Sequence, residues 1–151
     1  RVLFRSCNDK ITKIDLNNVE TIRQLAFHNS ALQVVVADKV KNIDGQAFQN
    51  SKLIRISLPE VETIGDNAFI GTSIQSVVIG SKLKSLGAYI VPKGTREVRI
   101  AVTTPNRVSI SPSVIESDNN TTLFVPKGYV NDWKLKFPEI GNTFKGGIKE
   151  M

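Results

Sequence analysis

The sequence contains very little of the residue types that build disulfide frameworks, metal centres and nucleophilic active sites. Its 151 residues include one Cys and one His. Cys7 cannot form an internal disulfide, and a single thiol without companions at ligand spacing does not define a zinc site. His28 lies in a repeated phrase whose other copies carry Gln49 and Ile70 at that position. We therefore expect neither a Cys7–His28 catalytic pair nor a bound metal or cofactor.

Long apolar runs are also missing. The longest are short pieces such as "LQVVVA", whereas a membrane-spanning helix needs about 20 apolar residues. We expect no membrane insertion in this segment. A content of 40% hydrophobic residues is enough for one domain with a continuous core. Because the sequence begins at Arg1, we expect a processed or excised piece, and the absence of an export signal decides nothing.

Positive charge exceeds negative charge, with a formal net charge of +6. Residues 82–107 form a basic flank with one acid, Glu97, and six basic residues: Lys82, Lys84, Lys93, Arg96, Arg99 and Arg107. Nucleic-acid sites combine clustered cations with aromatic stacking, and only Tyr89 offers a ring there. We expect a solvated flank and no nucleic-acid partner, and we keep this flank as the second candidate contact surface.

The chain repeats one nine-residue phrase three times. "VETIRQLAF" begins at residue 19, "VKNIDGQAF" at 40 and "VETIGDNAF" at 61, so each copy starts 21 residues after the previous one. A fixed period of this length indicates stacked structural repeats. The coils predicted from this spacing are 11–31, 32–52 and 53–73, followed by a looser coil at 74–97.

Each coil opens with a predicted strand. The segments "KIDL", "VVVA", "RISL" and "SVVI" are short and rich in β-branched residues, and their apolar residues recur two positions apart, as on one face of a strand. We expect each strand to lie beside the strand of the next coil. The first, fourth and sixth coil positions should point inward: Ile11, Ile14, Leu16; Leu32, Val35, Ala37; Leu53, Ile56, Leu58; Ile74, Val77, Ile79.

The rest of the coil carries a "VxxI" step and an Ala-Phe pair. We expect the "VxxI" step to cross the core and "GQAFQN" and "GDNAFI" to form short helical or 3₁₀ turns. The rings of Phe27, Phe48 and Phe69 should then stack as a ladder inside the coils. Small residues close each copy before the next strand: Ser30, Ser51 and Thr72.

The ends of a repeat array need caps, because no single coil buries its own apolar edge. Residues 98–151 break the period, and we expect an irregular last coil and a C-terminal cap there, after repeat coils over 1–97. "LFVP" reads as one last strand, and "KGYVNDWKLKF" as an amphipathic helix. We expect Trp133 to be a lid on the last coil rather than a sugar-stacking platform. At the other end, "RVLFRSCNDK" reads as the end of an earlier coil.

The phrase "VxxIGxxAFxxxxLxxIxLP" resembles the BspA-like, or Treponema-type, leucine-rich repeat, and the tail "LFVPKGYVNDWK" is similar to the cap that follows such repeats in surface proteins of host-associated bacteria. The residues that carry the match are Val61, Ile64, Gly65, Ala68, Phe69, Ile74, Val77 and Ile79. The resemblance implies an α/β fold, a right-handed leucine-rich-repeat solenoid with one short parallel β-strand per coil of about 21 residues and short helical or 3₁₀ turns. It also implies a secreted or cell-surface location, binding or adhesion, and no catalytic residue.

Two functions remain open. The first is a non-catalytic binding module for a protein or polysaccharide at a cell surface, and the alternative is a structural spacer or display arm of a longer surface protein. Carboxylates such as Asp15, Glu20, Glu60 and Glu62 are scattered without convergence, so we do not expect an enzyme. We expect the chain to be monomeric.

The predicted binding surface is the open face of the strands. Residues at the third and fifth coil positions must point away from the core, and they give one row of Lys13, Val34, Arg55 and Ser76 and another of Asp15, Val36, Ser57 and Val78. Within these rows, valines rimmed by cations suit a polar or acidic partner. The candidate ligand-binding residues are Lys13, Val34, Val36, Arg55, Ser57, Ser76 and Val78.

Overall fold

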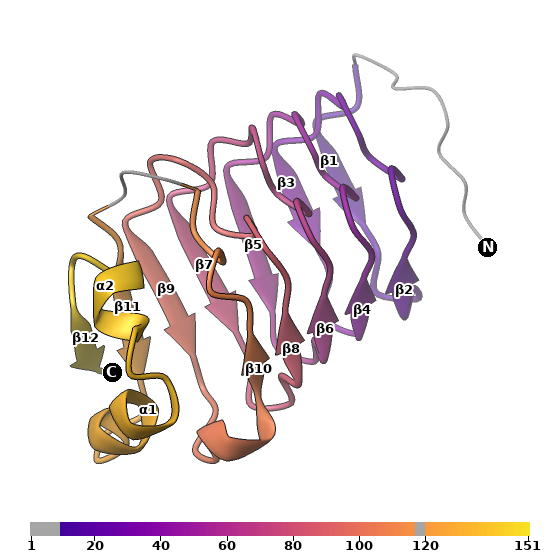
Figure 1. Ribbon diagram of the computed structural model, residues 1–151. Coiled ribbons are helices and arrows are strands. Elements are labelled where there is room, and N and C mark those ends of the chain that lie inside the picture. Colours follow the sequence, from indigo (N-terminus) through magenta and orange to yellow (C-terminus); the bar gives the residue numbers. More distant parts are fainter. Residues whose placement is uncertain (1–9, 117–119) are drawn as a thin grey trace.

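The computed structural model describes residues 10–116 and 120–151. The expectation for Cys7 lies outside these residues, as does the expectation for "RVLFRSCNDK" apart from Lys10. Figure 1 shows the chain as a stack of coils in sequence order, from the indigo N-terminal coils to the yellow C-terminal segment that holds the two α-helices. The solenoid predicted from the 21-residue period is confirmed.

One side of the stack is a parallel sheet, with seven strands in the described part of the chain. Neighbouring strands follow the order β1-β3-β5-β7-β9-β11-β12. The strands are β1 (Lys13–Asp15), β3 (Val34–Val36), β5 (Arg55–Leu58), β7 (Ser76–Ile79), β9 (Glu97–Ile100), β11 (Thr122–Val125) and β12 (Ile148–Glu150). The four strands predicted from the repeat are confirmed, and in β1, β3 and β5 each residue pairs with the one 21 positions away, as Lys13 does with Val34.

A second parallel sheet runs along another side of the stack, and the prediction of one strand per coil missed it. Its order is β10-β8-β6-β4-β2. The strands are β2 (Thr21–Ile22), β4 (Asn42–Ile43), β6 (Thr63–Ile64), β8 (Ser85–Leu86) and β10 (Ser109–Ile110). The "VxxI" isoleucines lie in these strands. Each two-residue segment forms a strand because its backbone groups pair with the same segment in the next coil.

The Ala-Phe segments are turns, so the expectation of helical or 3₁₀ turns there is wrong. Gln46 and Asn50 both have positive φ, 60° and 56°, which a right-handed helix does not allow. The N–H groups of Phe48 and Asn50 donate across to the next coil, to Ala68 O and Ile70 O, each at 2.8 Å. Contacts between coils therefore take the hydrogen bonds that a local helix would have used.

The phenylalanine ladder is confirmed. The ring centroids of Phe27 and Phe48 are 5.2 Å apart and those of Phe48 and Phe69 are 5.6 Å apart, with interplanar angles of 15° and 20°. Phe48 and Phe69 have no exposed surface. Inward positions are buried as predicted in the coils beginning at 32, 53 and 74. Ile11, in the first described coil, is an exception and is 43% exposed.

The C-terminal segment closes the other end. It contains a 3₁₀ turn, η1 (Pro105–Arg107), and two helices, α1 (Val130–Lys136) and α2 (Ile140–Thr143). Trp133 is fully buried, and its Nε1–H donates to Val102 O at 3.2 Å, so the predicted lid is confirmed. "LFVP" is strand β11 but it is not the last strand, because β12 adds a further parallel pair at the sheet edge, with Leu123 opposite Ile148.

Candidate functional site

The open face of the seven-stranded sheet carries two rows of outward side chains. In-register pairing aligns Val34 with Lys13 on one side and Arg55 on the other. Neighbouring strands in a sheet are about 4.8 Å apart, so side chains in a row are direct neighbours. All seven predicted residues lie in these rows, and each is exposed or half-buried: Lys13, Val34, Val36, Arg55, Ser57, Ser76 and Val78.

The structure brings some of these residues together and separates others. Val34 and Val36 lie two positions apart on β3 and share the face, with Arg55 opposite Val34 on β5. Val78 is 41% exposed but lies one strand further on, because Ser57 occupies the place between Val36 and Val78. The three valines therefore do not form one continuous patch.

The sequence prediction missed the continuation of the second row. Val78 is paired with Arg99 on β9, and Arg99 with Phe124 on β11. The Arg99 guanidinium lies 4.6 Å from the centroid of the Phe124 ring. It also donates two hydrogen bonds to Glu97, at 3.2 Å from Nε and 3.0 Å from Nη2.

Alternation was the signal that could have found these two residues. Val98 and Ile100 are fully buried on either side of Arg99, as are Leu123 and Val125 on either side of Phe124. That pattern places the residue between them on the open face. The strands keep the 21-residue spacing as far as β9, where Val78 pairs with Arg99, but Phe124 follows Arg99 by 25 residues, so extrapolating the 21-residue spacing does not reach β11.

The Val78–Arg99–Phe124 row has the chemistry of an interface centre. Arg and aromatic side chains are enriched at the positions that contribute most to protein–protein binding. The guanidinium of Arg99 is held by both a carboxylate and a ring, so it is ordered before a partner arrives. This row extends the predicted face toward the C-terminal coils.

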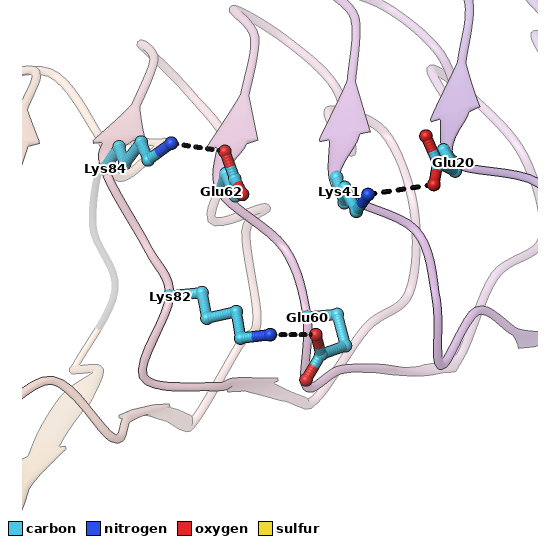
Figure 2. A network of polar contacts seen from close by, with 6 residues as sticks. All are labelled: Glu20, Lys41, Glu60, Glu62, Lys82 and Lys84. Atoms are coloured by element: carbon cyan, nitrogen blue, oxygen red, sulfur yellow. Dashed lines mark hydrogen bonds and ion pairs between the residues drawn. The ribbon is translucent and has the colours of Figure 1, made fainter.

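The basic flank has less available charge than its sequence indicates. Lys82 pairs with Glu60 and Lys84 with Glu62, both across to the preceding coil. Figure 2 shows these pairs beside a third, in which Lys41 Nζ is 2.8 Å from Glu20 Oε1. Arg99 of the same flank pairs with Glu97 on its own strand.

Two residues of the inter-coil pairs, Glu62 and Lys41, have shifted pKa values. The hydrogen bond from Lys84 lowers the pKa of Glu62, and the charges of Lys84 and Lys41 lower it further. The hydrogen bond to Glu20 raises the pKa of Lys41, and the charge of Glu20 adds to that effect. In both cases the charge in the adjacent coil favours the ionised form of Glu62 or Lys41. This alternating row of charges connects neighbouring coils.

Stacked coils with one strand of a long parallel sheet in each define the class of leucine-rich-repeat solenoids. The family model described as BspA type leucine rich repeat region (6 copies) matches residues 2–95, and the chain belongs to that family. Comparisons with curated proteins and with solved structures returned no match. Repeats of this family are usually non-catalytic, and proteins that carry them are commonly exposed at the cell surface.

Two further observations concern the described part of the chain. Within residues 10–116 and 120–151, no group of three or more His, Cys, Asp and Glu is placed to hold a metal ion. Over the same ranges, no helix has both the length and the apolar character needed to cross a bilayer.

Proposed function

We propose that this chain is a non-catalytic binding module of a secreted or cell-surface protein, and that it holds a protein partner on the open face of its seven-stranded sheet. The observation that carries the proposal is the Val78–Arg99–Phe124 row, in which a cation lies over an aromatic ring on a rigid surface. Leucine-rich-repeat modules bind proteins, which favours a protein over other ligands for this face.

Rigidity of the backbone supports this use of the face. Every strand of the sheet is hydrogen-bonded to its neighbours, so little conformational entropy is lost when a partner binds. The outward side chains do not fill the core, so they can differ between proteins of the family without loss of the fold. The cations Lys13 and Arg55 favour a partner whose contact surface is acidic.

Catalysis is disfavoured by how the carboxylates are used. Glu20, Glu60 and Glu62 each form an ion pair with a lysine on the next coil. A general acid requires a raised pKa, and that of Glu62 is lowered instead. The structure also favours the spacer alternative in one respect, because the stacked rings and inter-coil bonds that hold the coils together would make a stiff arm.

Binding to an array of purified extracellular and serum proteins tests the proposal. The variant Val78→Ser with Phe124→Ser should lose the signals that the unchanged chain gives. A matched control, Leu25→Asn with Leu135→Ser, removes two side chains that are 46% and 83% exposed away from the open face. A chain that binds nothing on the array would support the spacer instead, and equal loss of binding in both variants would show that the contact does not depend on the Val78–Arg99–Phe124 row.

A further inference from the structure

A second surface lies on the outer side of the other sheet. Residues of four successive coils line an open hollow there, with a volume of about 660 Å³. Its contributors run from Gln24 in the first described coil to Ser85 in the fourth. Three steps of about 4.8 Å between coils give the hollow a length on the order of 14 Å along the stack.

Glycines allow the coils to approach one another closely at this hollow. A Cβ on Gly65 would lie 2.6 Å from Gly45 N, and one on Gly87 would lie 2.7 Å from Asp66 N. Both distances are too short for a real side chain, so the coils approach this closely only because glycine occupies these positions. Gly45 and Gly65 line the hollow, which is therefore bordered by backbone and left without side chains at these points.

The walls are made of hydrogen-bonding groups that the fold already orients. Gln24 Nε2 donates to Gln46 Oε1 at 3.3 Å, and the Thr63 hydroxyl donates to Asn42 Oδ1 at 2.8 Å. Asp66 Oδ1 accepts the Ala88 N–H at 2.8 Å. An amide or a carboxylate has more than one donor or acceptor site, so each of these groups keeps capacity for a ligand after making its internal bond.

The charge of the lining selects against anions. Among the described residues that border the hollow, Asp44 and Asp66 are acidic and none is Lys or Arg. Arg23, which does not line the hollow, pairs with Asp44 at 3.9 Å, so Asp66 is the main negative charge of the lining. Phosphates and acidic polymers require clustered cations, so they do not fit this surface. A ligand rich in hydroxyl groups and without charge does fit, because amides and carboxylates can each bind paired hydroxyls.

An aromatic residue occupies the next repeat of one wall position. Tyr89 occupies the coil position that Gln46 and Asn67 occupy in earlier coils, and all three have positive φ: 52°, 60° and 59°. The preceding residue, Ala88, is bonded to both Asp66 and Asn67 on the hollow. The Tyr89 side chain is 41% exposed, so its ring can pack against the apolar face of a sugar.

We propose that the hollow is a binding site for a linear, uncharged polysaccharide that lies along the stack and spans about three pyranose rings. This site is separate from the open face of the seven-stranded sheet, so one module can hold a protein on one side and a glycan on the other.

The test is titration of the chain with three neutral hexasaccharides, cellohexaose, mannohexaose and xylohexaose, and with hexagalacturonic acid as the charged counterpart. The site variant is Gln46→Gly with Asn67→Gly, which removes two wall amides at positive φ, where glycine is unstrained. The matched control is Asn29→Gly with Asn50→Gly, which removes two amides at φ of 56° from positions that do not line the hollow.

At least one neutral hexasaccharide should bind with a Kd of about 1 mM or tighter. The site variant should weaken that binding by about tenfold or more, the control pair by less than about twofold, and Tyr89→Asn should weaken it as well. Absence of binding at about 10 mM of all three neutral sugars, equal losses in both amide pairs, or preference for the acidic sugar would overturn the proposal. The variant Val78→Ser with Phe124→Ser should leave sugar binding unchanged. This result distinguishes a failure of the sugar-site proposal from a failure of the proposal that the open face binds a protein.

Discussion

Phe48→Ala tests the packing that holds the coils together. Phe48 has no exposed surface, and its ring is stacked between those of Phe27 and Phe69 at 5.2 and 5.6 Å. Truncation removes contacts on both sides and leaves a cavity that the rigid neighbouring coils cannot close. Such a change costs about 3–5 kcal/mol in the free energy of unfolding.

For a chain of this size, each kcal/mol shifts the melting temperature by about 2–4 °C, so the expected decrease in Tm is about 6–20 °C. Circular dichroism during heating measures it. Gln49→Ala is the matched control, because residue 49 is adjacent in sequence and only half-buried. Phe48→Leu, which keeps most of the apolar volume, should recover part of the loss.

The same variant should show where the damage lies. In a stack whose coils contact only their neighbours, a defect in one coil weakens the adjacent interfaces most. Hydrogen exchange of the Phe48 amide, which is bonded to Ala68 O, should therefore accelerate more than exchange in β11. A Tm for Phe48→Ala no lower than that of Gln49→Ala would show that the ring stack does not stabilise the solenoid.

Three further predictions follow from the cap, the open face and the inter-coil charges. Truncation after residue 122 removes Trp133 and most of the last two strands, so the fragment should aggregate by light scattering; a monomer with unchanged circular dichroism would contradict this. Val34→Ser with Arg55→Ser should weaken binding of any protein ligand by about tenfold while Tm changes by less than about 3 °C, and unaltered affinity would place the contact elsewhere. The pKa of Glu62 is lowered in the folded state, so its contribution to the free energy of unfolding is complete above the ordinary value of 4.5 and is lost as the pH falls through the folded-state pKa. In urea titrations at stepped pH, the Glu62→Gln variant should therefore lose less stability than the unchanged chain as the pH is lowered from about 6.

The repeat made much of the fold predictable from the sequence. In strands β1, β3 and β5 each residue pairs with the same coil position 21 residues away, so a long-range pairing such as Lys13 with Val34 appears as a simple period. Alternation then showed which side chains face inward, and the recurrent Phe marked the ladder. The same logic extends to the pairs Glu20–Lys41 and Glu62–Lys84, whose partners are one coil apart.

Several features could be decided only by the tertiary structure. The strands of the second sheet are two residues long, too short to show any alternation, and they exist because identical segments lie side by side in the stack. Residues in the turns around Gln46 take positive φ because their N–H groups donate hydrogen bonds to the next coil. Local sequence propensity cannot predict this, since the acceptors belong to another coil.

The division of the chain at residue 97 stays a prediction from the spacing alone. Beyond that point the spacing changes, since η1 and β10 lie between β9 and β11. The juxtaposition of Arg99 with Phe124 and the strand β12 therefore had no periodic signal. In this protein the sequence determined what repeats, because each repeat carries its own apolar pattern. Where the repeat ends, only the tertiary structure determined which strands and side chains are neighbours. The reason is that backbone hydrogen bonds between coils depend on the position of the strands in space and not on residue type.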